Sequence, residues 1–210
     1  MELIQQYFPE LDEHQLQQLQ QLGDLYREWN QKINVISRKD IDAVYDHHIL
    51  HSLAIARFVE FEPDSEILDL GTGGGLPGIP LAILFPDVRF TLIDGTRKKI
   101  MVVQEIINAL ELTNAKALHQ RAEETKHKYD FVICRAVASL DKLVAWSFPL
   151  IKKKQKHVVP NGLLTLKGGD LRQEIKELGT GHYVDQEEVF DFFPQTPYFK
   201  EKYVVYVQHG

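Results

Sequence analysis

Apolar residues recur at helical spacing in the first third of the chain. Between Leu16 and Ile33 they return every three or four positions, and Gln, Glu and Arg fill the positions between them. This is the period of an amphipathic helix that buries one face. A second stretch of the same kind runs from about Asp40 to Phe61. We therefore expect a helical N-terminal extension over residues 1–62.

After Pro63 the pattern changes to short apolar runs that alternate with helical stretches. The runs that predict strands are ILDL, VRFTLID, KALHQ, DFVICRAV and GLLTLK. Strands that alternate with helices in this way form parallel βαβ units. The stretches HYVDQEEVFDFF and KYVVYV follow, with the loop PQTPYFKE and no predicted helix between them, which suits an antiparallel hairpin. Residues 63–210 are thus predicted to form one compact, doubly wound α/β domain with a mostly parallel seven-stranded sheet.

Composition narrows the class of protein. The 210 residues are 44% hydrophobic with a net charge of −6, so we expect a folded globular protein that is not basic overall. The N-terminal residues lack a basic start followed by an apolar core, and no run approaches the roughly eighteen apolar residues that span a bilayer. Secretion and membrane insertion are not expected. Because Cys134 is the single cysteine, no internal disulfide is possible, and we place the protein in the cytoplasm.

A glycine-rich loop follows the first predicted strand. The segment DLGTGGGLPGIP, from Asp69 to Pro80, holds five glycines and two prolines. A strand that ends in such a loop and opens a helix places backbone N–H groups at the carboxyl end of the sheet, where open α/β folds bind ligands. One or two glycines would satisfy a plain turn. We therefore expect a small molecule to approach the backbone here.

Two ligand classes compete for this loop. Gly73 to Gly78 match G-x-G-x-x-G, which is typical of dinucleotide binding. However, Pro77 and Pro80 lack the N–H groups that would grip a pyrophosphate. The prolines favour S-adenosylmethionine, which carries a sulfonium and an amino-acid tail instead of phosphates, and an NAD-dependent oxidoreductase stays as the alternative.

Acidic residues near the loop suit such a ligand. Asp94, at the end of the next predicted strand, is expected to accept hydrogen bonds from ribose hydroxyls. Asp69 is expected to accept from the amino group of the methyl donor or to order water near it, and the alternative is that it caps amides of its own turn. The segment Arg121-Ala122-Glu123 follows the third predicted strand, where the adenine edge would lie.

Five segments in order resemble one known family. They are DLGTGGGLPGIPLAI, TLIDGTRKK, QRAEE, ICRAVASL and LTLKGG. Together they closely resemble RsmG, the bacterial 16S ribosomal RNA methyltransferase family also called glucose-inhibited division protein B. The resemblance covers nearly the whole chain, including KINVISRKD and HHILHSL.

The resemblance implies a Rossmann-like class I methyltransferase fold and transfer of a methyl group from S-adenosylmethionine to N7 of a guanine in the 530 loop of the small ribosomal subunit RNA. It also implies that the partner is 16S rRNA or the small subunit, and separately we expect a monomer. The residues placed at the cofactor, from the residues themselves or from the resemblance, are Asp69, Gly71, Gly73, Gly75, Leu76, Asp94, Ala122, Glu123 and Arg135. Those placed around the cofactor and target base are Arg121, Arg135 and Lys167.

The chain departs from the family pattern at two positions. His51 stands where the family usually has Asp, and Lys202 stands where it usually has Arg. The first departure removes an acidic side chain. The second keeps a positive charge but loses the bidentate fork of a guanidinium.

The chemistry expected of N7 methylation agrees with the residue types. N7 of guanine carries a lone pair and no proton, so the reaction needs alignment and no general base. Arg135 and Lys167 are therefore expected to position the ligands through O6 or phosphate, with a plain salt bridge as the alternative for each. The segment Cys134 to Val137 lacks the D/N-P-P-Y/F motif of amino-methylating enzymes, and we expect Cys134 to be a small buried residue rather than a nucleophile.

Positive charge is concentrated in two segments. Between Leu150 and Lys176 there are seven Lys or Arg against two Asp or Glu, and Arg97-Lys98-Lys99 follows Asp94. We expect these clusters to contact RNA phosphates beside the methyl-donor pocket, which an RNA-binding protein without catalytic activity would also do. For the lysine run, the alternative is a solvated loop without such a contact. His47 and His51 have a spacing that can hold a metal, but no third ligand accompanies them and we expect no metal site.

Overall fold

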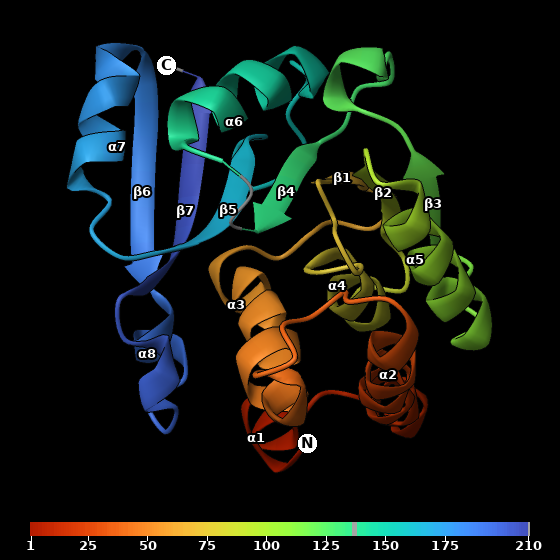
Figure 1. The fold of residues 1–210 in the computed structure, drawn as a ribbon. Helices are drawn as coiled ribbons and strands as arrows, with labels where there is room; N and C mark the ends of the chain where they lie inside the picture. The colour runs from red at the N-terminus through yellow and green to blue at the C-terminus, as the bar shows by residue number, and fades with distance from the viewer. Residues whose placement is uncertain (136–137, 210) are drawn as a thin grey trace.

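Seven strands form a single mixed sheet in the computed structural model of the chain, which describes residues 1–135 and 138–209 (Figure 1). The strand order is β3-β2-β1-β4-β5-β7-β6, and the pairs among β1 to β5 are parallel. The strands are β1 (Glu66–Leu70), β2 (Arg89–Asp94), β3 (Ala115–His119), β4 (Phe131–Arg135), β5 (Leu163–Gly168), β6 (His182–Glu188) and β7 (Lys202–His209). The α/β sheet predicted from the sequence is confirmed.

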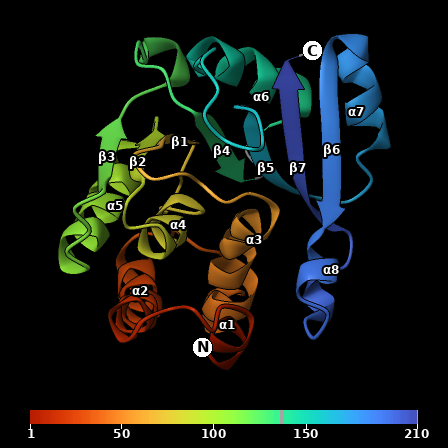
Figure 2. The ribbon, with the colours of Figure 1, turned by 180° about the vertical axis from the view of Figure 1, so that it is seen from behind.

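The C-terminal hairpin is also confirmed, with one correction. Strand β7 pairs antiparallel with both β5 and β6, and Figure 2 shows β6 at the edge of the sheet beside α7 (Arg172–Leu178). The predicted strand HYVDQEEVFDFF ends early, and its last part forms the short helix α8 (Val189–Phe192). The register pairs Glu188 with Tyr203 near the start of β7, so the residues after Glu188 have little partner strand left.

Helices cover both faces of the sheet. One face carries α2 (Glu13–Lys32), α3 (Leu50–Phe58), α4 (Gly78–Leu84) and α5 (Arg97–Ala109), and the other carries α6 (Leu140–Ser147) and α7. Because successive residues of a strand point to opposite faces, Ile67 of β1 joins the core under α2 to α5, whereas Leu68 joins the core under α6 and α7. Each face is thus sealed by apolar burial.

The predicted N-terminal helices are present, although the second is irregular. Helix α2 starts in a capping box: Asp12 Oδ1 accepts from the N–H of Gln15 at 2.8 Å, and Gln15 Oε1 accepts from the N–H of Asp12 at 3.1 Å. The second stretch is a 3₁₀ turn over Ile41–Ala43, a π-helical turn over Val44–Ile49 and then α3. Helix α1 (Glu2–Tyr7) precedes them.

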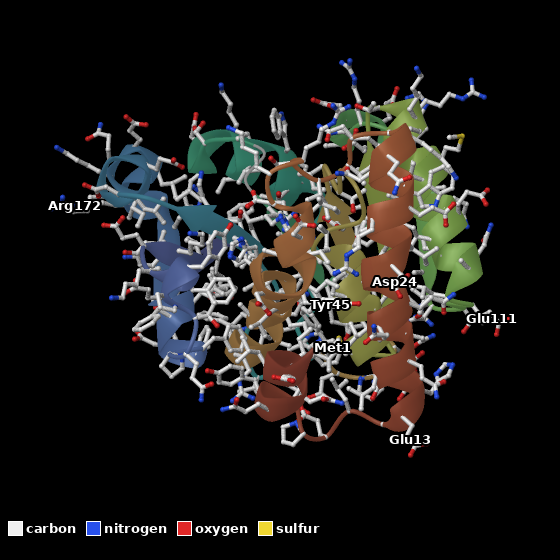
Figure 3. All side chains as sticks on the ribbon, turned by 60° about the horizontal axis from the view of Figure 1, so that its bottom comes forward. Met1, Glu13, Asp24, Tyr45, Glu111 and Arg172 are labelled. Atoms are coloured by element: carbon white, nitrogen blue, oxygen red, sulfur yellow. The ribbon has the colours of Figure 1, made fainter. Side chains whose placement is uncertain are left out.

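The extension shares its core with the sheet. Ile4, Leu22 and Tyr26 are fully buried in the same cluster as Ile67. Tyr45 of the π-helical turn lies against α2 (Figure 3), and its hydroxyl donates to the carbonyl of Gln20 at 2.8 Å. The boundary at residue 62 is therefore a change in secondary structure inside one packed body. None of the helices among the described residues combines the length and hydropathy that crossing a bilayer requires.

Asn30 fixes the turn that follows α2, and it generates a stability prediction. Its buried Oδ1 accepts from the N–H groups of Val35 and Ile36, at 2.9 and 3.0 Å. Asn30→Ala leaves two donors without a partner, so we expect the free energy of unfolding to fall by about 2 kcal/mol. Asn30→Asp keeps an acceptor in place and should lose less. Urea unfolding of the three proteins measures this; equal midpoints for Ala and Asp would contradict it.

Candidate functional site

The glycine loop lies at the carboxyl ends of the parallel strands, and a buried carboxylate organises it. Asp69, in β1, is fully buried. Its Oδ2 accepts from Thr72 Oγ1 at 2.5 Å and from the N–H of Gly78, the first residue of α4, at 2.9 Å. The capping contact considered as an alternative is therefore present. Among the described residues, the second oxygen, Oδ1, is buried with no hydrogen-bond partner, so the predicted contact to a ligand still has an acceptor.

Burial raises the pKa of Asp69 to about 7, although the hydrogen bonds from Thr72 and Gly78 oppose the shift. Removing a carboxylate from water penalises its charged form. The positive guanidinium of Arg135 also favours ionisation, but less than burial disfavours it. The Asp69 carboxyl is consequently poised to change its charge near neutral pH.

Most of the glycines in the loop have a reason inside the protein, which corrects the argument that five of them require a ligand. Three have φ in the left-handed region: Gly71 (69°), Gly73 (62°) and Gly75 (97°). A Cβ on Gly78 would lie 2.6 Å from Asp69 Oδ2, and one on Gly74 would lie 2.8 Å from the Val35 side chain. Within the part of the chain that the structure describes, nothing lies within 4 Å of that position at Gly73, so the loop is open there.

Asp94 connects the loop to the end of β2. Its Oδ2 accepts from the N–H of Gly73 at 3.0 Å, and its Oδ1 accepts from the N–H of Thr96 at 2.7 Å. A carboxylate has about four acceptor sites, so each oxygen keeps capacity for a further donor. The partly exposed carboxylate borders the open part of the loop, where the ribose contact was predicted.

Arg135, at the end of β4, reaches the N-terminal extension. Its Nη1 lies 3.2 Å from His48 Nδ1. A guanidinium only donates, so Nδ1 accepts and the imidazole proton is on Nε2. Burial, reinforced by the Arg135 charge, lowers the pKa of His48 to about 4, which keeps the ring neutral. Burial lowers the pKa of Arg135 as well, while Tyr26 and Asp69 act in the opposite direction.

His48 and Tyr26 were missed by sequence reasoning. The Tyr26 hydroxyl donates to the carbonyl of Gly74 at 2.9 Å, so α2 contacts the loop directly. Tyr26 was visible only as one apolar position of an amphipathic helix. His47 and His51 stood out by their spacing, and nothing local indicated that His48 between them meets a strand end 87 residues away.

His47 and His51 go to different places. The His47 ring stacks on Tyr198, with centroids 3.5 Å apart and planes 5° apart. His51 is buried against Phe199, and burial lowers its pKa well below the usual value. Lys202, the other departure from the family pattern, donates to the Tyr198 carbonyl at 2.6 Å and lies 3.9 Å from the centre of its ring. In the described part of the chain, no group of three or more His, Cys, Asp or Glu side chains is placed to hold a metal.

Lys167 has the salt bridge that was its alternative role. The side chain is 8% exposed, and its Nζ donates to Glu174 Oε2 at 2.5 Å and to the Ala138 carbonyl at 2.8 Å. The same Glu174 oxygen accepts from the N–H of Leu140 at 3.0 Å. Lys167 therefore joins β5 to α6 and α7, and its contact with a phosphate or O6 stays a prediction.

In the segment after β3 and at the loop residue Leu76, the groups that could contact a ligand are mainly backbone atoms. Ala122 and Leu76 are buried, whereas Arg121 and Glu123 are exposed. The N–H of Arg121 donates to Glu124 Oε2 at 2.8 Å, and a Cβ built on Gly95 would lie 3.8 Å from the Arg121 side chain. The predicted adenine contacts are thus next to the Asp94 loop.

The structure buries Cys134 completely, and burial raises the pKa of its thiol to about 12. A thiol of this kind is not a nucleophile at neutral pH. Ala136 and Val137, which completed the segment compared with the amino-methylating motif, lie outside the described residues.

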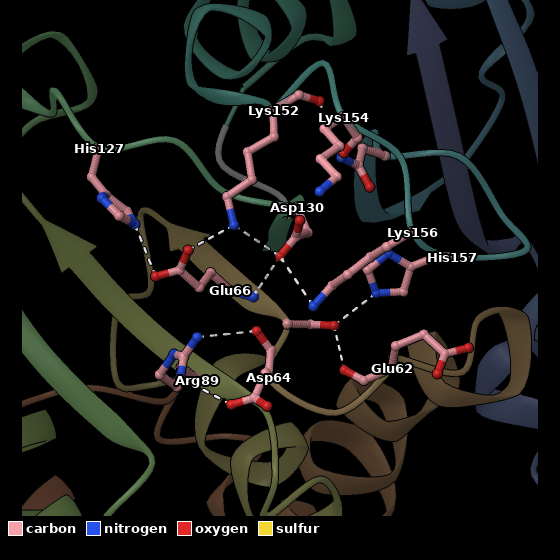
Figure 4. Close-up of polar contacts among 12 residues, drawn as sticks. Glu62, Asp64, Glu66, Arg89, His127, Asp130, Lys152, Lys154, Lys156 and His157 are labelled. Carbon is pink, nitrogen blue, oxygen red and sulfur yellow. Dashed lines mark hydrogen bonds and ion pairs between the residues drawn. The ribbon is translucent and has the colours of Figure 1, made fainter.

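The position expected for the lysine run is wrong. Lys152, Lys153, Lys154 and Lys156 precede β5, so they lie at the amino edge of the sheet, opposite the glycine loop. Lys152 Nζ is 2.6 Å from Glu66 Oε2 at the start of β1 (Figure 4). The basic segment Arg97–Lys99 does lie at the carboxyl edge, in the first turn of α5.

Comparisons with known proteins identify the family of the chain. A family model described as rRNA small subunit methyltransferase G (GidB) matches residues 15–195. A ribosomal RNA small subunit methyltransferase G from Flavobacterium johnsoniae is 51% identical over 207 residues, which cover 99% of this chain and 97% of the relative. A protein of the same name from Phocaeicola vulgatus is 52% identical over 210 residues, covering 99% and 98%.

Solved structures share the fold. A ribosomal protein L11 methylase from Lactobacillus delbrueckii subsp. bulgaricus superposes with a TM-score of 0.59 at 12% identity, over 76% of each chain. The fibrillarin/Nop5p complex gives a TM-score of 0.56 at 11% identity, over 75% of this chain and 79% of that one. At such low identity these matches describe the architecture alone.

The pKa of Asp69 predicts how stability depends on pH. Because the folded-state pKa of about 7 exceeds the unfolded value of roughly 4, the folded protein binds more protons in between. The contribution of Asp69 to stability is therefore present below about pH 4 and is lost as the pH rises through 7. Asp69→Asn resembles the protonated acid and should remove this loss.

Urea unfolding of the wild type and Asp69→Asn at pH 4.5, 6 and 7.5 measures the difference. We expect Asp69→Asn to gain stability relative to the wild type as the pH rises. A difference that stays constant across the three pH values would show that the carboxyl does not titrate in this range.

Proposed function

The chain belongs to the GidB family, rRNA small subunit methyltransferase G, and from this premise we propose that it transfers a methyl group from S-adenosylmethionine to N7 of a guanine in the 530 loop of 16S rRNA. The observation that carries the proposal is the family match over residues 15–195. The geometry of the loop supports it. The loop is open at Gly73, Asp94 borders this opening, and the strands that carry Asp69 and Arg135 end at the same edge of the sheet.

The residues present fit this cofactor. Asp69 keeps one buried carboxylate oxygen without a partner among the described residues, which suits a cationic amino group. Asp94 keeps acceptor capacity for ribose hydroxyls beside Gly73, where no atom of the described residues lies within 4 Å of the position that a Cβ would take. When bound, S-adenosylmethionine supplies a methyl group on a positively charged sulfur. Asp69 and Asp94 would hold opposite ends of it, with the backbone of the loop between them.

The start of α4 supports a methyl donor over a dinucleotide. The N–H of Gly78 donates to Asp69, and the N–H of Ile79 donates to the Gly75 carbonyl at 2.8 Å. Pro80 has no N–H, and the N–H of Leu81 donates to the Pro77 carbonyl at 3.3 Å. A pyrophosphate at a helix N-terminus needs free donors in this turn. Every position of the turn is either engaged or proline.

The proposed reaction asks the protein for positioning. N7 has a lone pair and no proton, so attack on a methyl carbon needs the nucleophile in line behind it, and no proton has to leave. The polar groups fit this demand, because Cys134 is buried and protonated and His48 Nδ1 is engaged by Arg135. Methylation makes the purine positive, so the guanidinium of Arg135 would help only by donating to O6 or to phosphate.

Ligand binding gives the first test. Titration calorimetry should show binding of S-adenosylmethionine and no heat with NAD. Transfer of labelled methyl to 30S subunits, followed by mapping of the modified nucleotide, should locate N7 of one guanine in the 530 loop. Binding of NAD alone would support an oxidoreductase, and ligand binding without methyl transfer would support an RNA-binding protein that lacks catalysis.

Arg135 gives the second test. Arg135→Ala removes the donor held by His48 at the end of β4, and misplacement of reacting groups costs on the order of 100-fold in rate. We expect kcat to fall by about this factor while the unfolding midpoint changes little. The matched control is Arg89→Ala, because Arg89 is exposed at the amino edge and its guanidinium pairs, among residues 1–135 and 138–209, with Asp64 alone. Near-normal turnover of Arg135→Ala would refute the role.

The proposal includes a monomeric enzyme in the cytoplasm, where small ribosomal subunits are made and methylated. Sedimentation analysis at the concentrations used for the methyl-transfer assay tests the monomer. A dimer that persists on dilution would contradict this part alone, and the assigned chemistry would stand.

A further inference from the structure

Five lysines gather at the amino edge of the sheet, far from the glycine loop. They come from the segment before β4 and the segment before β5: Lys128, Lys152, Lys153, Lys154 and Lys156. We call them the amino-edge lysines. Two carboxylates lie among them, those of Glu66 and Asp130, so the cluster keeps an excess of positive charge in a chain whose net charge is −6.

Two of the amino-edge lysines are anchored by these carboxylates (Figure 4). Lys152 Nζ lies 2.6 Å from Glu66 Oε2 and 3.2 Å from Asp130 Oδ2, and Lys156 Nζ lies 4.0 Å from the same Asp130 oxygen. Asp130 Oδ2 also accepts from the N–H of Glu66 at 2.8 Å. The anchor therefore belongs to the framework of β1 and β4.

The segment that carries the lysines is a built structure. Asn161, which is 4% exposed, donates through Nδ2 to the carbonyls of Lys152 and Lys154, at 3.1 and 2.9 Å. His157 packs edge-on against Phe131 with ring centroids 4.9 Å apart, and its Nε2 lies 2.7 Å from Ser65 Oγ. These contacts fix the backbone from which the ammonium groups project.

Of the other three, Lys128 donates to the carbonyl of Pro149, which leaves Lys153 and Lys154 available. Within the described ranges, the exposed side chains of Lys153 and Lys154 have no ion pair or hydrogen bond through their ammonium groups. Lys153 borders a cavity of about 660 Å³ together with Lys128, Lys152, Gln155 and Asn161. Phe148 and Ile151 add apolar surface to the same cavity. The surface is thus a positively charged hollow with a partly apolar wall.

The distance from the proposed methyl-transfer site limits what this hollow can bind. Strand β4 runs from Phe131, beside the lysines, to Arg135 at the glycine loop. Five residues in a strand span roughly 15 Å. A ligand that contacts both ends of β4 must therefore be longer than one nucleotide, and a flipped target base cannot reach the amino-edge lysines.

We propose that the amino-edge lysines bind the phosphodiester backbone of the RNA substrate, at a segment outside the one that carries the target guanine. The inference rests on the proposed function. Lysine ammonium groups bind phosphates as point charges without reading sequence, and two exposed lysines on an anchored segment suit an RNA backbone whose path varies. An acidic protein segment would also be attracted to these lysines. RNA is favoured because the proposed substrate already supplies one anionic backbone that is long enough to contact both edges of the sheet.

The test compares Lys153→Gln/Lys154→Gln with a control of equal charge change, Lys116→Gln/Lys200→Gln, whose lysines are exposed elsewhere and belong to neither basic segment. Binding to deproteinised 16S rRNA is measured over a range of salt concentrations. Two lost phosphate contacts should reduce the slope of log K against log salt by about 1.5. They should also weaken binding on the order of tenfold at 0.15 M salt, with a matching rise in KM for subunits and an unchanged kcat. An isolated hairpin of the target loop should bind both variants like the wild type.

Each other outcome overturns the inference. If the wild type methylates subunits but the lysine variant keeps the wild-type slope and KM, the surface does not contact RNA, and the proposed function stands. Weaker binding to subunits but not to deproteinised rRNA would assign the surface to a ribosomal protein. Equal loss on the isolated hairpin would place the contact within the target segment. Failure of the wild type to transfer methyl groups contradicts the proposed function separately.

Discussion

The buried carboxylate of Asp69 is the constraint on which the site depends. It lies where β1 turns into the glycine loop, and one of its oxygens holds both Thr72 and the first N–H of α4. Glycine is needed at position 78 because a Cβ there would meet that oxygen. Burying a carboxylate is costly, as the pKa of about 7 shows. The buried carboxylate lies at a turn whose shape sets the position of the whole glycine loop.

The two edges of the sheet carry charges of opposite sign, which the net charge of the chain does not show. Its carboxyl edge carries a loop with acidic residues on either side, Asp69 and Asp94, which suits a cationic ligand. Its amino edge carries an excess of lysines over carboxylates. Because parallel strands run the full depth of the sheet, these charges lie at opposite ends of β1 and β4. A single small ligand cannot use both, whereas a polymer can.

The parts of the fold that the sequence predicted are those with a local period. Helix α2 and the alternation of strands and helices follow from spacing alone, and Asp69, Asp94 and Arg135 could be placed because they end predicted strands. The contact between Arg135 and His48 could not, since it joins residues far apart in sequence. Nor could the bond from Lys167 to Glu174, which depends on how α7 packs. The edge that carries the lysines was predictable, because residues before a parallel strand lie at its amino end.

Because His48 is neutral, the N-terminal extension can contact Arg135 in the site without repelling its positive charge. A protonated imidazole 3.2 Å from a guanidinium nitrogen would place two positive charges together and push them apart. With a pKa of about 4, His48 instead offers a lone pair that orients Arg135 and leaves its charge intact. Tyr26 of the same extension contacts the loop directly, because its hydroxyl donates to the Gly74 carbonyl. The helical extension thus fixes both the loop and the cation that faces it, so the glycine loop and β4 alone would not make the site.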